Sequence, residues 1–169
     1  MTSQSHYKGI PYSPSRQDGD LVIKPISLDI IWGKDPRYWR LPQSQTDYAE
    51  LLQVCWLEVS GSVELNQLNP GKHKISFALS LKPDAFGWAG SPIYLMVKVG
   101  SGGFKWKSYN LSTMGPTDKK RIPDDFCFEV GQNDTSGGEK LHFGLYEIWR
   151  GRWKGGLLIH EVVISKATG

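Results

Sequence analysis

Apolar and polar residues alternate along much of this chain with the period of two that is typical of β-strands. In one such segment Ile75, Phe77, Leu79 and Leu81 fall on the same face. These segments are separated by turns rich in Gly, Pro and Asn, such as residues 69–71. The pattern predicts strands over residues 21–32, 53–65, 72–82, 92–99, 104–110, 125–131, 140–149 and 157–165.

Two local signals interrupt this pattern. Residues 42–52 combine a cap-like Thr46 with a run of helix-forming residues, which predicts one helical turn. Gly61 and Ser62 lie inside a predicted strand, where they suggest a bulge or a bend. About eight strands with Gly-rich turns and almost no helix favour an all-β fold. We predict an antiparallel β-sandwich that is jelly-roll-like and has at most one short helix.

The chain has 169 residues and is long enough for a single well-filled core. Residues 1–20 are rich in Ser, Gln, Pro and Gly, which predicts a flexible N-terminal tail or a strand-free wrap. Residues 21–169 are predicted to form one domain.

The charge and the hydropathy of the chain limit the classes of protein to which it can belong. The formal net charge is +3, and the basic residues are scattered rather than gathered in the dense stripe of a dedicated nucleic-acid binder. No apolar run reaches membrane-spanning length, and the N-terminus has no secretion signal, so we expect a cytoplasmic or nucleocytoplasmic protein. The four histidines are far apart, so we expect no metal site and no cofactor.

The two cysteines are expected to be free thiols. Cys55 shares its predicted strand face with Leu57 and Val59 and is expected to be buried. Cys127 shares a more polar face with Glu129, which makes it the candidate for an intermolecular disulfide.

Tryptophans provide the strongest functional signal, because several of the seven lie beside Gly and charged residues at strand ends. Trp32 and Trp39 bracket a turn-like run that contains Tyr38, and Trp149 and Trp153 bracket a basic turn. Rings in such positions favour a surface platform for sugars, nucleobases or cations. Core packing is the alternative for Trp32 and Trp39.

Two other tryptophans lie within predicted strands. Trp56, in an apolar run, is predicted to belong to the core. Trp106 lies between Lys105 and Lys107 and is either a secondary ligand or dimer contact, or part of an edge strand that the lysines protect.

Three segments together resemble the phloem protein 2 family of plant lectins, typified by the tobacco agglutinin. Residues 28–39 (LDIIWGKDPRYW) resemble its first motif, and residues 49–61 (AELLQVCWLEVSG) resemble its second. Residues 145–148 (LYEI) with 153–159 (WKGGLLI) resemble its third. The resemblance covers residues 25–165 approximately, with the motifs in order.

This resemblance implies a non-catalytic lectin that binds N-acetylglucosamine oligomers (chitooligosaccharides) and N-glycan cores. It also implies a homodimer that is nucleocytoplasmic or present in phloem sap. Some members associate with RNA and, through disulfides, with a filament-forming phloem protein. Trp32 and Trp39 match the family's paired tryptophans, and Glu147 matches its C-terminal acidic residue. The family's second carboxylate aligns with Lys140, beside Glu139.

A site for N-acetylglucosamine requires an aromatic shelf, a carboxylate acceptor and a hydrogen-bond donor. We expect Trp32, Tyr38 and Trp39 to form the shelf, and Glu147 to accept hydrogen bonds from the sugar. The basic turn is expected to add contacts from Arg150, Trp153 and Lys154. Of these, Lys154 or Arg150 is expected to supply the hydrogen-bond donor.

Three other functions compete with sugar binding. A chitin hydrolase needs two carboxylates in a recognisable arrangement, and the sequence shows no such motif, so we expect no enzyme activity. RNA binding would use the same aromatic and basic surface, with bases stacked on the rings. An interaction protein would bury the aromatics at a dimer interface.

Overall fold

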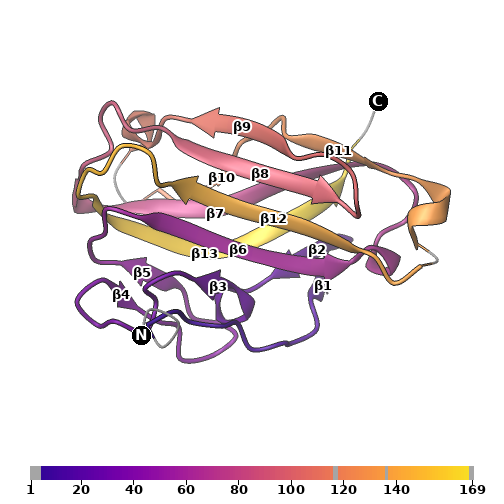
Figure 1. Ribbon diagram of the computed structural model, residues 1–169, viewed down its shortest axis with the longest axis horizontal. Helices are drawn as coiled ribbons and strands as arrows, with labels where there is room; N and C mark the ends of the chain where they lie inside the picture. The colour runs from indigo at the N-terminus through magenta and orange to yellow at the C-terminus, as the bar shows by residue number, and fades with distance from the viewer. Residues whose placement is uncertain (1–4, 116–117, 136, 168–169) are drawn as a thin grey trace.

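The computed structural model describes residues 5–115, 118–135 and 137–167 and shows two antiparallel sheets packed face to face (Figure 1). Sheet A has the strand order β3-β6-β12-β8-β9. In sheet B, β13 is hydrogen-bonded to β2, β5 and β7, while β1 extends β2, β4 extends β5, and β10 and β11 pair with β7. The predicted all-β antiparallel sandwich is confirmed.

Sheet A consists of five strands, and in Figure 1 β9, β8, β12 and β6 lie side by side in one layer. Its strands are β3 (Asp29–Ile30), β6 (Leu57–Glu64), β8 (Ile93–Val99), β9 (Lys105–Tyr109) and β12 (Lys140–Glu147). Sheet B contains β1 (Ser15–Gln17), β2 (Asp20–Ile23), β4 (Trp39–Arg40), β5 (Ala49–Leu51), β7 (Gly71–Phe86), β10 (Lys120–Ile122), β11 (Cys127–Val130) and β13 (Gly155–Lys166).

The described residues contain only short 3-10 helices. These are η2 (Pro25–Ser27), η3 (Leu65–Gln67), η4 (Leu111–Thr113) and η5 (Gln132–Thr135). None of the helices in the described part of the chain is long and apolar enough to cross a membrane.

The core lies between the sheets and is formed by the alternating apolar residues. The predicted face of β7 is buried, with Ile75, Phe77 and Leu79 each at most 1% exposed. The ring of Phe77 meets the ring of Phe143 from β12 at 6.2 Å between centroids, in an edge-to-face arrangement that joins the two sheets.

The predicted helical turn over residues 42–52 is wrong, because this segment is a loop followed by β5. The Asp47 carboxylate accepts hydrogen bonds from the backbone N–H groups of Gln43 and Tyr48 and forms an ion pair with Arg40. These contacts compete with helical hydrogen bonds. Ala49 and Leu51 then alternate into the core, where β5 pairs with β13.

The predicted bulge at Gly61 and Ser62 is also absent, since β6 pairs with β12 in unbroken register there. Gly61 is required for space, because a Cβ atom would lie 2.9 Å from both Leu28 and the Phe143 ring. The register shifts of the sandwich lie instead in β13.

The first described residues contact the domain. Tyr7 forms an isolated bridge with Ile30, and its hydroxyl donates to the Ile26 carbonyl at 2.6 Å. Strand β1 also lies within the segment for which the sequence predicted no strand, and it pairs with β2.

Candidate functional site

A strip of aromatic rings crosses the loops at one end of the sandwich. The ring centroids of His6 and Trp32 are 5.5 Å apart, those of Trp32 and Tyr38 are 6.2 Å apart, and those of Tyr38 and Trp153 are 6.1 Å apart. We call these four residues the loop cluster. Trp32 and Tyr38 are half-buried against the core, whereas Trp153 is 50% exposed.

The turn that follows β3 holds Trp32 in an unusual conformation. Its φ angle is 65°, in the left-handed region that non-glycine residues rarely adopt. The backbone N–H of Trp32 donates to His6 Nδ1 at 3.1 Å, and its carbonyl accepts from the Asp35 N–H. Strained residues of this kind cluster at binding sites, which makes this turn a candidate.

An ion pair fixes the other half of the same loop. The Arg37 guanidinium donates to both carboxylate oxygens of Asp35, and the Arg37 backbone N–H donates to the same group. These hydrogen bonds lower the pKa of Asp35. The Asp35 carbonyl accepts from the N–H groups of Tyr38 and Trp39, and this turn directs the Tyr38 ring toward Trp153.

Trp39 is not part of the surface shelf, and its predicted exposure is wrong. It is 2% exposed, packs in the core, and pairs with Leu51 between β4 and β5. Its Nε1 atom has no hydrogen-bond partner among the described residues. Adjacent strand residues point in opposite directions, and here Trp39 takes the inward position.

Glu147 and Lys154, predicted as direct sugar contacts, form a buried ion pair instead. Their side chains are 1% and 0% exposed, and Lys154 Nζ lies 3.1 Å from Glu147 Oε1. Both Glu147 oxygens lack a partner with hydrogen-bond geometry among the described residues. The Lys154 ammonium donates to the carbonyls of Cys55 and Arg152, so the pair joins two loops beneath the loop cluster.

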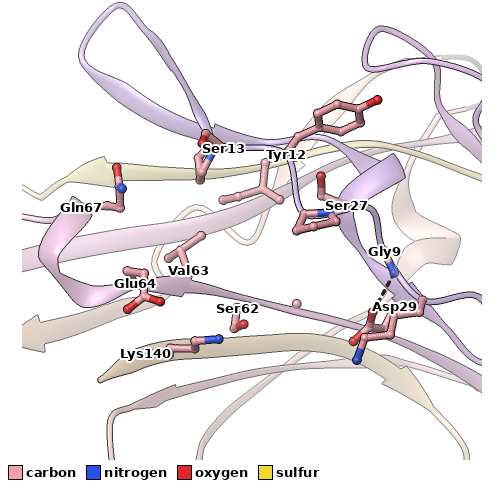
Figure 2. Close-up of a pocket in the computed structure, with 15 residues that line it drawn as sticks. Gly9, Tyr12, Ser13, Ser27, Asp29, Ser62, Val63, Glu64, Gln67 and Lys140 are labelled. Carbon is pink, nitrogen blue, oxygen red and sulfur yellow. Dashed lines mark hydrogen bonds between the residues drawn. The ribbon is translucent and has the colours of Figure 1, made fainter. Parts of the chain in front are cut away.

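Lys140, which the resemblance aligns with the family's second carboxylate, lies far from this end. Lys140 and Glu147 occupy opposite ends of β12, roughly 24 Å apart at the rise of an antiparallel strand. Figure 2 shows Lys140 beside Glu64 and Ser62 in a separate pocket. This pocket has a volume of about 440 Å³, and N-terminal residues such as Gly9 and Tyr12 line it in part. Within it, Gly9 N donates to Asp29 Oδ1 at 2.8 Å.

Arg150 belongs to a different surface from the loop cluster. It lines a hollow together with Tyr94, Trp106 and Trp149, on the outer side of sheet A. The sequence pattern alone does not indicate that these three aromatic residues form one site. The alternation of Tyr94, Met96 and Lys98 along β8 was the available signal, since it marks an outward face.

Trp56 and the two cysteines differ in part from their predicted environments. Trp56 is 45% exposed rather than buried, and its Nε1 donates to Glu58 Oε1 at 2.9 Å. Cys55 is half-buried rather than fully buried, and Cys127 on β11 is half-buried as well. Both are free thiols in this single chain, and the intermolecular disulfide through Cys127 stays a prediction.

His6 is the member of the loop cluster that the sequence analysis missed. It lies in the segment that was predicted to be a tail. The pairing of Tyr7 with Ile30 and the hydrogen bond from Lys34 N–H to the Ser5 carbonyl bring it beside Trp32. Within the described residues, no three His, Cys, Asp or Glu side chains are grouped as metal ligands.

Comparisons with known proteins identify the family. A sequence model described as Phloem protein 2 matches residues 20–166. The Arabidopsis thaliana protein PHLOEM PROTEIN 2-LIKE A9 is 40% identical over 183 aligned residues, which cover 98% of this chain and 99% of that protein. A Luffa acutangula protein named Lectin is 32% identical over 147 residues, which cover 82% of this chain and 66% of the Luffa protein.

Similar solved structures include TmCBM61 in complex with β-1,4-galactotriose. It aligns with a TM-score of 0.42 and 15% sequence identity, over 95% of this chain and 92% of the other. The family match covers nearly the whole sandwich, and the alignment with the Arabidopsis relative covers 98% of this chain. This chain therefore belongs to the phloem protein 2 family.

Proposed function

We propose that this protein is a non-catalytic lectin that binds N-acetylglucosamine oligomers and N-glycan cores at the loop cluster. The observation that carries the proposal is the convergence of Trp32, Tyr38 and Trp153 on one surface. Trp32 and Tyr38 come from one loop and Trp153 from a segment far away in the sequence, yet the ring centroids of neighbouring members are 6.2 and 6.1 Å apart. Family membership and the name of the Luffa relative support a carbohydrate ligand.

The loop cluster offers the chemistry that a pyranose ring needs. The exposed Trp153 ring and the edge of Tyr38 provide a surface for the sugar's C–H face. The Arg37 guanidinium lies 5.0 Å from the centre of the Tyr38 ring and is largely exposed, so it can donate to the acetamido carbonyl. In this arrangement Glu147 and Lys154 position the Trp153 loop from below and do not touch the sugar.

Replacing Trp153 with Ala is expected to weaken chitotriose binding about two- to tenfold, because one stacking surface of about 0.5–1.5 kcal/mol is lost. Isothermal titration calorimetry on the folded variant measures this change. Trp106→Ala removes an equally exposed ring from the other surface and is expected to leave the chitotriose affinity of the loop cluster unchanged.

Two results would contradict this proposal. Wild-type protein that gives no heat with chitotriose would exclude the ligand. Binding that survives Trp153→Ala but is lost in Trp106→Ala would move the site to the outer side of sheet A.

RNA binding, the alternative function, receives less support from the positions of the basic residues. Lys154 is buried, the Lys105 ammonium donates to the Cys127 carbonyl, and Lys107 is paired with Asp125. Fewer cations are therefore free to contact a phosphate backbone near these aromatic residues.

A homodimer, a disulfide through Cys127 and a cytoplasmic, nuclear or phloem-sap location belong to the same proposal. The support for the disulfide is the partial exposure of Cys127 on β11. Sedimentation velocity with and without reductant tests the assembly: a monomer in both conditions would exclude the dimer and the disulfide. A fluorescent fusion expressed in plant tissue tests the location, and retention in the secretory pathway would exclude it.

A further inference from the structure

The outer side of sheet A carries a second group of aromatic residues, separate from the loop cluster. Strand register places Tyr146 of β12 directly beside Tyr94 of β8, and Met96 of β8 beside Trp106 of β9. The connection between β12 and β13 then brings Trp149 over Tyr94, with ring centroids 4.9 Å apart. Three strands and one loop thus contribute rings to the same surface, which we call the sheet-A face.

The rings of the sheet-A face hold one another in fixed orientations. Trp106 meets Trp149 at 6.2 Å and 76°, and it meets Tyr146 at 5.5 Å and 62°. Phe104 extends the row, with its ring 6.4 Å from Trp106 and tilted by 30°. Mutual edge-to-face contacts of this kind stabilise ring positions without covering the outward faces.

These rings are unusually exposed for their size. Phe104, Trp106 and Trp149 are 61%, 48% and 56% exposed. They border two neighbouring hollows. One, of about 610 Å³, is lined by Tyr94, Trp106, Trp149 and Arg150. The other hollow, of about 400 Å³, has Phe104 and Tyr146 among its lining residues. Trp106 lines the first hollow and contacts both Phe104 and Tyr146, so it connects the two hollows.

Polar side chains border the rings and provide hydrogen-bonding groups. Ser60, Ser62, Lys98 and His142 line the second hollow, and Arg150 lines the first. Burial, together with the nearby Glu58 carboxylate, raises the pKa of Tyr146, so its hydroxyl stays a neutral donor. Rings bordered by donors and acceptors match a sugar, which has flat C–H faces and a rim of hydroxyl groups.

A glycine shapes the floor of this surface. A Cβ atom on Gly144 would lie 2.5–2.7 Å from atoms of the Tyr146 side chain, so only glycine lets that ring lean along β12 over residue 144. The Tyr146 ring therefore spans the middle of the sheet, between Trp106 and the polar side of the surface.

The charge on the sheet-A face favours a sugar over a nucleic acid. Asp29 and Lys98 line the same hollow, and Glu58 lies beside Tyr146, so both signs of charge are present. Nucleic-acid sites are predominantly basic. The core of a protein interface is depleted of charged residues, whereas here they lie among the rings.

We propose that the sheet-A face is a second carbohydrate-binding surface, which takes a linear chain of β-linked pyranose rings. The chain lies along the row from Arg150 past Trp106 to Phe104, with successive sugars on successive aromatic residues. This proposal goes beyond the loop cluster and does not depend on it. The β12–β13 connection separates the two surfaces, because it directs Trp149 to the sheet-A face and Trp153 to the loop cluster.

Nuclear magnetic resonance of the seven tryptophan indole N–H groups tests this proposal, with chitohexaose and cellohexaose as probes. Trp106→Phe and Trp149→Phe assign the two relevant signals by their loss. We expect the Trp106 and Trp149 signals to shift with at least one hexaose. A response to both sugars indicates recognition of the pyranose chain itself, and a response to chitohexaose alone indicates that the acetamido groups are required.

Affinity measurements separate this surface from the loop cluster. Trp106→Ala is expected to reduce the hexaose affinity reported by the Trp149 signal about two- to tenfold, while Trp153→Ala leaves it unchanged. Shifts confined to Trp32 and Trp153 would overturn the second surface and leave the lectin proposal standing. Shifts confined to Trp106 and Trp149 would support the second surface and contradict sugar binding at the loop cluster.

One further result would overturn the sheet-A proposal. If sedimentation velocity shows a wild-type dimer that Trp106→Ala converts to monomers, the rings form a contact between two copies of the chain. Circular dichroism spectra of all variants check that the fold is retained.

Discussion

Replacing Lys154 with Met is expected to lower the free energy of unfolding by about 3–5 kcal/mol, since it leaves a buried carboxylate without its counter-charge. Lys154 and Glu147 are almost inaccessible to solvent and 3.1 Å apart. The same ammonium also donates to the carbonyls of Cys55 and Arg152, and these acceptors lose their partner in the variant. Urea unfolding followed by circular dichroism measures the change.

Two control variants show whether this effect comes from burial. Lys107→Met removes the cation of an exposed pair with Asp125 and is expected to cost about 0–1 kcal/mol. The double variant Glu147→Met with Lys154→Met removes both charges and is expected to recover most of the lost stability. A Lys154→Met protein as stable as Lys107→Met would show that Glu147 is not held as a buried anion.

The second large effect is expected at Trp39, where replacement by Ala should cost about 3–5 kcal/mol through loss of packing. Trp39 is 2% exposed and lies in the core between the sheets. Any loss of sugar binding in this variant should therefore follow the unfolded fraction, and the folded fraction should keep the wild-type affinity. Calorimetry with chitotriose, combined with urea unfolding, separates these two quantities.

Trp39→Phe is the matched control. It keeps an aromatic ring in the core and removes a buried Nε1–H that has no partner in the described structure, so we expect a smaller loss of stability. A Trp39→Ala protein with wild-type stability and no chitotriose binding would contradict the core assignment and place Trp39 in the sugar site.

The long strands were predictable because their signal is local. In β7 and β8, large apolar residues recur at every second position, and this period can be recognised without knowing the partner strands. The short strands gave no such signal. β4 and β5 contain two and three residues, and they form because Trp39 pairs with Leu51 while Ala49 pairs with Ile159 of β13. Partners this distant leave no local pattern.

The candidate site was predictable only in part, for a similar reason. The resemblance and the ring positions indicated Trp32, Tyr38 and Trp153, and the structure brings these three together. The remaining predicted residues lie away from the loop cluster. The sequence does not reveal whether a residue at a strand end turns inward or which surface it faces. Glu147 and Lys154 form a closed pair below the surface, and Arg150 faces the other hollow.

By itself, the sequence determined the sandwich class, the main strands and the family of this protein, because periodicity and motif order are properties of the chain alone. Tertiary structure alone decided which aromatic residues reach the surface and which of them meet. Trp56 and Trp39 exchange their expected environments, and Tyr94, Trp106, Tyr146 and Trp149 form one surface through cross-strand register and a folded-back loop. The physical reason is that exposure and ring contact depend on neighbours supplied by distant segments.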